Sequence, residues 1–263
     1  MTINFQKGEI RYRLVGQGPC IVLLHGFLGS SKIWNKYAEK LSTKFTVLSI
    51  DLPGHGKSTV LADVFSMNVM AETVKAVLDH LKISQVTLVG HSMGGYVSLA
   101  FAQLFPNSVS GVTLMNSTAL PDSSERKKER ERAIKLAEGH KLKYITAVVP
   151  NWFFERTGQK ANKRILKMVK IAAKTSKEGI QASLKGMRDR KDLTSVIAKA
   201  NFPIQIIAGK NDFVIPLEQA QQLAALNPKC RIDVLNECGH IGFLEAKEDC
   251  FKALQSFVLE NFL

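Results

Sequence analysis

The chain has 263 residues, of which 45% are hydrophobic, and its formal net charge is +13. This length fits one large α/β domain, or one domain that carries a smaller inserted one, and no low-complexity tract suggests disorder. No apolar run approaches the roughly 18 residues of a membrane span, and residues 1–9 lack the basic and apolar regions of a signal peptide, so we expect a cytoplasmic protein.

Strand and helix patterns alternate along the chain. Two short strands are predicted first, at 4–7 and 9–15, and the apolar run at 20–24 is typical of a strand buried on both faces of a parallel sheet. Further strands are predicted at 45–50, 86–89, 109–115, 204–208 and 231–235, and helices around 34–41 and at 69–81, 93–104, 217–226 and 245–259. This alternation predicts an α/β fold with a mostly parallel sheet covered by helices on both faces.

The interval 118–201 interrupts this alternation, because it has helical patches but no strand-like apolar runs. Between residues 122 and 200 there are 21 Lys and Arg against 9 Asp and Glu, and the rest of the chain has 15 against 14. The sharp change in composition predicts an α/β core of residues 1–117 and 202–263, and a basic helical cap of residues 118–201 above the sheet.

The sequence Gly90-His91-Ser92-Met93-Gly94 lies between a predicted strand and a predicted helix. A G-x-S-x-G motif in this context is a nucleophile elbow. The turn is so tight that the backbone of the serine is strained, and small residues two positions away avoid clashes with the neighbouring strand and helix. The motif therefore predicts that Ser92 is a nucleophile.

A serine nucleophile needs a base, and the base needs an acid that fixes its tautomer. His240 follows the last predicted strand, and Asp212 follows the strand at 204–208. Both residues should lie at the edge of the sheet where such folds bind ligands. The chain order Ser92, Asp212, His240 is the one expected with this elbow. Asp51 and His55, in a Pro-Gly turn, are interpreted as structural residues.

Two backbone N–H groups are candidates for an oxyanion hole. One belongs to Met93, at the start of a helix, and the other to Phe27, in the loop after the strand at 20–24. The side chain of Phe27 should then form a wall of the substrate pocket. We expect Trp152 and Phe154 to line the acyl pocket, to anchor the cap to the core, or both.

These motifs resemble those of the α/β-hydrolase superfamily over essentially the whole chain. The resemblance includes His25-Gly26-Phe27, the stretch 51–58, the elbow at Ser92, Asp212 and Gly239-His240. It implies an eight-stranded, mostly parallel sheet whose second strand is antiparallel, with a helical cap. It implies neither a metal nor a cofactor, and the four cysteines, which have no C-x-x-C spacing, favour free thiols over a metal site.

The superfamily supports several reactions, so its fold does not fix the function. Epoxide hydrolases and haloalkane dehalogenases of this kind use an aspartate at the elbow, and Ser92 argues against both. We therefore predict a serine hydrolase that cleaves a small-molecule carboxylic ester with a small to medium, apolar acyl group through an acyl-Ser92 intermediate. The alternative is a menaquinone-pathway lyase, although Tyr96 stands where those lyases tend to carry an arginine.

The basic cap leaves a choice of partners open. Related esterases that act on acyl chains tethered to an acidic carrier protein dock it on cationic cap residues, and the plainer interpretation is a solvated helical face. The candidates for docking are Arg126, Lys127, Lys128, Arg130, Arg132 and residues 188–191. The cap lacks the interleaved aromatic residues of a nucleic-acid-binding surface, so we expect no nucleic-acid partner and no membrane partner.

Overall fold

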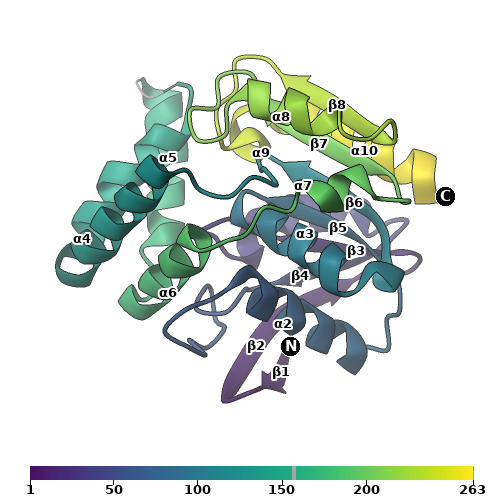
Figure 1. Cartoon of the computed structure of the whole chain (residues 1–263), viewed down its shortest axis with the longest axis horizontal. Helices are drawn as coiled ribbons and strands as arrows, with labels where there is room; N and C mark the ends of the chain where they lie inside the picture. The colour runs from purple at the N-terminus through teal and green to yellow at the C-terminus, as the bar shows by residue number, and fades with distance from the viewer. Residues whose placement is uncertain (156–157, 263) are drawn as a thin grey trace.

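An eight-stranded sheet forms the centre of the protein (Figure 1). A computed structural model describes residues 1–155 and 158–262. The strands lie in the order β1-β2-β4-β3-β5-β6-β7-β8. Their bounds are β1 (Thr2–Phe5), β2 (Gly8–Val15), β3 (Cys20–Leu24), β4 (Thr46–Ile50), β5 (Val86–His91), β6 (Val109–Met115), β7 (Ile204–Gly209) and β8 (Cys230–Leu235).

Strand β2 runs antiparallel to both of its neighbours, β1 and β4, and the strands from β4 to β8 pair in parallel. This confirms the expected eight-stranded sheet with an antiparallel second strand. Every residue of β3, β5 and β7 is buried, because helices cover both faces of the parallel part of the sheet. The carboxyl ends of these strands meet at one edge, where the loops after β3, β5, β6, β7 and β8 come together.

Helices pack on the two faces of this sheet. Tyr37 of α1 and Phe251 of α10 make an edge-to-face contact with ring centroids 5.2 Å apart, while α2 packs against α3, in front of the sheet in Figure 1. The helices of the core are η1 (Ser31–Trp34), α1 (Asn35–Leu41), α2 (Met67–His80), α3 (Met93–Leu104), η2 (Pro106–Ser108), α8 (Leu217–Ala224), α9 (Gly242–Glu245) and α10 (Lys247–Phe262).

Two helix predictions need correction. Helix α2 begins at Met67 rather than at residue 69, because the Ser66 side chain accepts a hydrogen bond from the Val69 N–H and caps the helix. The helix predicted for 245–259 is present as α10, but it runs from Lys247 to Phe262. The chain leaves helical geometry at Ala246 (φ −112°, ψ 51°), so α9 ends there and α10 starts at the next residue.

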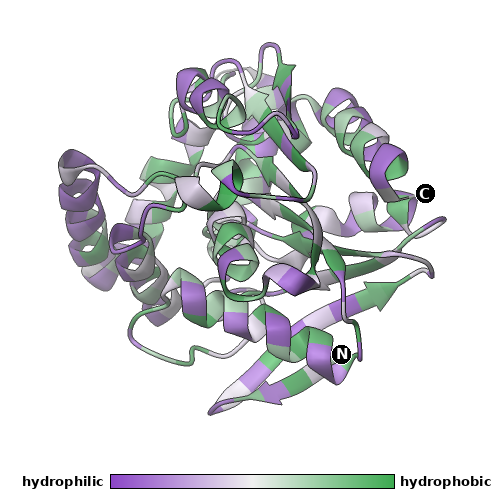
Figure 2. Cartoon of the chain, turned by 45° about the vertical axis from the view of Figure 1, so that its right-hand side comes forward, coloured by the Kyte–Doolittle hydropathy of each residue, from purple (hydrophilic) through white to green (hydrophobic). Residues whose placement is uncertain are grey.

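The segment 118–201 lies between β6 and β7 and contains α4 (Ser124–Val148), η3 (Val149–Trp152), α5 (Gln159–Ala172), α6 (Lys177–Arg188) and α7 (Thr194–Ala198). We call it the helical segment. Helices α4, α5 and α6 stand to one side of the sheet, at the left of Figure 1. Figure 2 shows the helices at the left of its view as largely hydrophilic and the strands as largely hydrophobic. This hydrophilic character agrees with the excess of Lys and Arg counted between residues 122 and 200.

Helix α6 makes an unusually close contact with the loop between β4 and α2. A Cβ atom on Gly186 would lie 1.7 Å from the Phe65 carbonyl oxygen, and one on Gly179 would lie 2.3 Å from the Gly54 oxygen. The Phe65 N–H also donates to the Ala182 carbonyl, at 3.0 Å. Only glycine permits backbones to approach this closely, so α6 is fixed against the core along its whole length.

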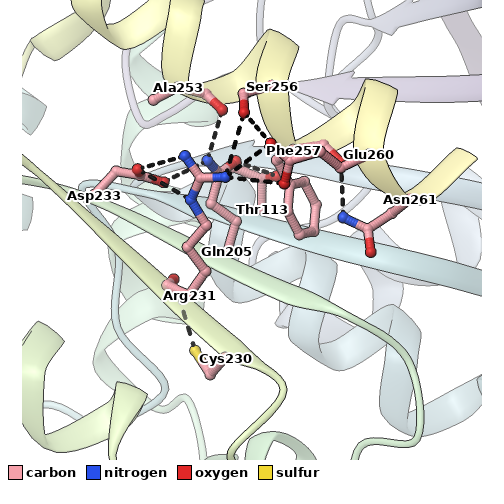
Figure 3. A network of polar contacts seen from close by, with 10 residues as sticks. All are labelled: Thr113, Gln205, Cys230, Arg231, Asp233, Ala253, Ser256, Phe257, Glu260 and Asn261. Atoms are coloured by element: carbon pink, nitrogen blue, oxygen red, sulfur yellow. Dashed lines mark hydrogen bonds and ion pairs between the residues drawn. The ribbon is translucent and has the colours of Figure 1, made fainter.

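A polar network ties α10 to the sheet edge formed by β7 and β8 (Figure 3). Gln205 lies within β7 and is fully buried. Its amide donates to Asp233 Oδ2, at 2.7 Å, and to the Ala253 carbonyl, at 2.9 Å, while its oxygen accepts from Thr113. The Arg231 guanidinium joins Asp233 to α10. Every hydrogen-bonding group of the buried Gln205 amide side chain therefore has a partner.

None of the helices in the described ranges is both long and apolar enough to cross a membrane. The four cysteines are free, as their spacing indicated. Burial raises the pKa of Cys20 and of Cys250 to about 12, so these two thiols stay protonated at neutral pH and pack as small apolar groups.

Candidate active site

Ser92 occupies a strained turn between β5 and α3. Its φ of 51° and ψ of −117° lie outside the regions that most residues adopt. A Cβ atom on Gly90 would lie 2.3 Å from the Gly94 oxygen, so the turn requires a small residue there. The Ser92 N–H donates to Met115 O at 3.0 Å, and its carbonyl accepts from Ser117 Oγ at 2.8 Å. These contacts with the end of β6 hold the turn in place.

Ser92, His240 and Asp212 form one chain of hydrogen bonds. The Ser92 Oγ lies 2.8 Å from His240 Nε2, and His240 Nδ1 lies 2.8 Å from Asp212 Oδ2. All three residues are buried, and they come from the loops after β5, β8 and β7. Because the carboxylate can only accept, His240 carries its proton on Nδ1 and presents a free Nε2 to the serine hydroxyl. The geometry suits transfer of the serine proton to the imidazole.

The surroundings of Asp212 favour its charged form. Its Oδ1 accepts from the N–H groups of Val214, at 2.8 Å, and Ile215, at 3.0 Å. Its Oδ2 accepts from Asn116 Nδ2, at 3.0 Å, as well as from His240. Burial by itself would raise the pKa of Asp212, but His240 and these hydrogen bonds outweigh burial and lower it. Asp212 therefore stays ionised and holds the imidazole in one orientation.

Two positioning residues were not found from the sequence. Asn116 Nδ2 donates to the Gly239 carbonyl, at 3.0 Å, in addition to Asp212. His91 Nε2 donates to the His240 carbonyl, at 2.9 Å, and burial lowers the pKa of His91 to about 3, so its ring is neutral. Both residues fix the backbone around His240. The available signal for Asn116 was its place directly after the predicted strand at 109–115.

Glu245 links the histidine loop to the helical segment. Its Oε1 accepts from the Phe154 N–H, at 2.8 Å, and its Oε2 accepts from the Gly239 N–H, at 2.9 Å. The His240 N–H donates to the Trp152 carbonyl, at 2.7 Å. Partial burial raises the pKa of Glu245. The loop that carries His240 is thus joined to residues 152–154 by one direct hydrogen bond and by a bridge through Glu245.

Asp51 and His55 hold loops near the site. The Asp51 carboxylate accepts from the N–H groups of Ser31, at 2.7 Å, and Lys57, at 2.9 Å. His55 bridges two loops, because its Nδ1 donates to Pro53 O and its Nε2 accepts from the Leu28 N–H. The Asp51 carboxylate and the His55 ring thus form their hydrogen bonds with backbone groups of these loops. This agrees with the structural role inferred from the Pro-Gly turn.

A small cavity of about 70 Å³ lies against Ser92 and His240. Trp152 is part of its wall, with its ring centroid 6.4 Å from that of His240. Phe154 is not, since it is 40% exposed, so the expectation that it lines the pocket is not met. The wall also includes Phe27, His91, Tyr96, Arg126, Arg130, Tyr144, Val148, Met187 and Val214.

The two predicted oxyanion donors are at the same edge of the sheet. Phe27 follows β3, and Met93 is the first residue of α3. The Phe27 ring lies 6.2 Å from that of His55 and 6.5 Å from that of Tyr144, which fixes the side chain in the cavity wall. Among the described residues, no group of three or more His, Cys, Asp or Glu side chains is placed to hold a metal ion.

Two arginines among the docking candidates have largely buried side chains. The side chains of Arg130 and Arg190 are 13% and 7% exposed, and both donate to Asp122, which is itself 2% exposed. They cannot contribute to an exposed docking surface. Arg126, at 39% exposed, pairs with Glu129 on the surface of α4.

The sheet topology, the strained serine turn and the hydrogen-bonded Ser-His-Asp chain together define a hydrolase of the α/β type. Residues 19–247 match the family described as alpha/beta hydrolase fold. The chain belongs to this family, and esterases are among its relatives.

Individual relatives are similar over most of their length. The pimeloyl-[acyl-carrier protein] methyl ester esterase of Methylococcus capsulatus is 27% identical, covering 94% of this chain and 97% of that protein. A dihydrolipoyllysine-residue acetyltransferase component of an acetoin cleaving system, from Pseudomonas putida, is 30% identical over 97% of this chain and 70% of its own. The malate-bound structure of a thermophilic esterase from Thermogutta terrifontis matches with a TM-score of 0.93, at 28% identity, covering 97% and 95% of the two chains.

Proposed function

We propose that this protein hydrolyses a carboxylic ester of small to medium size through an acyl-enzyme intermediate on Ser92. The observation that carries the proposal is the hydrogen-bonded chain from Ser92 Oγ through His240 to Asp212, with 2.8 Å at both contacts. Ser92, at one end of these hydrogen bonds, borders a cavity whose apolar wall includes Phe27, Trp152 and Val148. Such a wall suits an apolar part of the acyl group.

The proposed reaction has two halves. In the first, the Ser92 oxygen attacks the ester carbonyl carbon while His240 Nε2 takes the hydroxyl proton. The tetrahedral intermediate collapses, the bond to the alkoxy oxygen breaks, and His240 gives the proton to the leaving alcohol. In the second half, His240 takes a proton from water, the resulting hydroxide attacks the acyl carbon, and Ser92 recovers its proton as the acid leaves.

The negative charge of each tetrahedral intermediate needs donors that are already in place. The backbone N–H groups of Phe27 and Met93 are the candidates. Met93 begins α3, so its N–H is one of the amides that no carbonyl within the helix can satisfy. The positive end of the helix dipole adds to its effect.

Replacing the nucleophile tests the proposal. Ser92→Ala should lower kcat for p-nitrophenyl acetate by about 10⁴-fold or more, while Ser195→Ala, at an exposed position of α7, should leave it unchanged. A fluorophosphonate probe should label the wild-type chain and not Ser92→Ala. Turnover of Ser92→Ala close to that of wild type would overturn the assignment. An assay of the menaquinone-pathway lyase reaction with the same proteins tests the alternative, in which the same three residues catalyse an elimination.

A second candidate substrate is an acyl ester carried by an acidic protein. The similarity to a pimeloyl-[acyl-carrier protein] methyl ester esterase favours it, and Lys127, Lys128 and Arg132 are exposed on α4. Docking through such cations weakens as salt screens them. Turnover of a carrier-linked ester should then fall steeply with ionic strength, and turnover of the matching free ester should not. Equal salt dependence would remove this candidate.

A further inference from the structure

The cavity at Ser92 contains positive charge in its wall. Arg126 and Arg130 both belong to it, and the described lining residues include no Asp or Glu. The two arginines are four residues apart on α4, so they lie on the same face of the helix. A second, larger cavity of about 580 Å³ shares both of them, together with Tyr96 and Val214. Both arginines therefore border the outer cavity, whose wall also includes Asp122 and Asp192, as well as the cavity at the nucleophile.

The carboxylates that pair with these arginines do not neutralise their positive charge. Asp122 accepts from Arg130 Nε, at 2.8 Å, and from Arg190 Nη1. One buried carboxylate thus serves two buried guanidinium groups, which leaves a net charge of +1. Burial opposes the charge on Arg130, but Asp122 outweighs it and keeps the pKa of this residue above its usual value. The pair of Arg126 with Glu129 is on the surface, where ion pairs contribute little.

Arg190 and Arg130 differ in the donors they have left for a ligand. Arg190 donates to the carbonyls of Leu120 and Met187, both at 3.0 Å, and its guanidinium carbon lies 4.3 Å from the centroid of the Tyr96 ring. Within the described part of the chain, Arg130 donates through Nε alone. Its Nη groups therefore remain for a molecule bound in the cavity. Buried donor groups that lack an acceptor are costly, so a ligand that accepts from the Arg130 Nη groups would lower this cost.

We propose that the substrate carries a carboxylate and that Arg130 and Arg126 bind it. This inference rests on the proposed esterase function and specifies its substrate class: a monoester of a short dicarboxylic acid. The methylene chain of the acyl group packs on the apolar wall, and the free carboxylate meets the guanidinium groups. A carboxylate matches the planar donor pair of arginine, which binds two oxygens in parallel.

Two esters that differ at one end of the acyl chain test this directly. Mono-p-nitrophenyl glutarate and p-nitrophenyl valerate have acyl chains of equal length, and only the former ends in a carboxylate. Wild-type kcat/KM should be at least about tenfold higher for the glutarate ester at low salt. Arg130→Gln and Arg126→Gln should each lower the ratio of the two kcat/KM values by about 10- to 100-fold. Lys135→Gln removes one exposed charge from the same helix and should leave this ratio unchanged.

Each outcome has a distinct meaning. If wild type cleaves both esters equally through Ser92, the proposed function stands and the carboxylate site is wrong. If Arg130→Gln fails to fold because Asp122 loses a partner, the test rests on Arg126→Gln, whose side chain is half-exposed. The ratio of the two kcat/KM values is then measured on that variant. If neither ester is cleaved, the esterase proposal fails, and calorimetry of monomethyl glutarate on Ser92→Ala tests the site alone. Binding that Arg126→Gln does not weaken, or no binding at all, would overturn it.

Discussion

The hydrogen bonds around Asp212 determine on which nitrogen His240 carries its proton. Three donors besides the imidazole, from Val214, Ile215 and Asn116, converge on the carboxylate. This arrangement fixes the carboxylate as an acceptor toward His240 Nδ1. Nε2 therefore keeps a free lone pair that can accept the serine proton. This follows from the hydrogen bonds around Asp212, on the Nδ1 side of the ring.

Asp212→Asn should therefore disable the base without removing it. The new amide would turn its oxygen to the N–H groups of Val214 and Ile215 and donate its own N–H to His240 Nδ1. Nε2 would then carry the proton and could not accept another. We expect kcat/KM for p-nitrophenyl acetate to fall by about 10³- to 10⁴-fold. Asp79→Asn, at an exposed ion pair of α2, is the control, and a loss of less than tenfold in Asp212→Asn would contradict the mechanism.

Residues of the candidate site could be predicted from the sequence where they directly follow a strand. Ser92, Asp212 and His240 each have that position, and chain order distinguished them from Asp51 and His55. Arg130 and Arg190 could not be found in this way. Their burial depends on Asp122, which is 8 residues from one and 68 from the other, so only the folded helices bring the three together.

At the scale of secondary-structure elements, Glu245 joins α9 to both the histidine loop and the end of η3. Its two oxygens bind the Gly239 and Phe154 N–H groups, and the helix breaks at the next residue, Ala246. The sequence predicts that the last helix begins at residue 245 and does not predict the short helix α9 before it. Glu245 contacts a residue 91 positions away, and a contact of this kind leaves no local signal in the sequence.

Glu245→Ala should loosen this junction. It removes two charge-assisted hydrogen bonds, so we expect the free energy of unfolding to fall by about 2 kcal/mol. Amide hydrogen exchange of residues 152–154 and 238–240 should accelerate more than that of β5, and kcat should fall because His240 is less well held. Glu248→Ala, an exposed neighbour on α10, should change neither. Uniform acceleration across the sheet would instead indicate only global destabilisation.

At the scale of the whole molecule, buried histidines make the fold sensitive to acid. Burial lowers the pKa of both His55 and His91 to about 3, so the folded state keeps them neutral. The unfolded chain binds protons below a pKa of about 6.5. Stability is therefore lost as the pH falls from about 6.5 toward 3. Asp212, whose pKa is lowered, keeps its full contribution until the pH approaches its unfolded value of about 3.9.

Between pH 7 and pH 5 each of these two histidines should cost about 2 kcal/mol, since one pKa unit corresponds to about 1.4 kcal/mol. Burial also lowers the pKa of His25, so urea unfolding at the two pH values should show a combined loss of more than about 4 kcal/mol. His91→Asn should remove about 2 kcal/mol of this pH dependence whatever its stability at pH 7, and the exposed His80→Asn should remove none. A loss that is the same in all three proteins would mean that other groups bind the protons.

The order of layers in the molecule could be predicted from the alternation of strands and helices, and the antiparallel second strand from the resemblance to the superfamily. The way the helical segment sits on the core could not. Its contact through Gly179 and Gly186 is with the loop at residues 54–65, more than 110 residues earlier in the chain. Glycines inside a helix pattern give no sign of the backbone they will meet.

That glycine contact has a consequence for attempts to alter specificity by exchanging parts between relatives. Helix α6 and the loop at 54–65 fit each other at backbone distance, so they behave as one unit although they lie on different sides of the predicted boundary at 118. A chimaera that imports a foreign segment 118–201 with larger residues at positions 179 and 186 would force these backbones apart. A productive exchange has to carry the loop at 54–65 together with the helices, or keep both glycines.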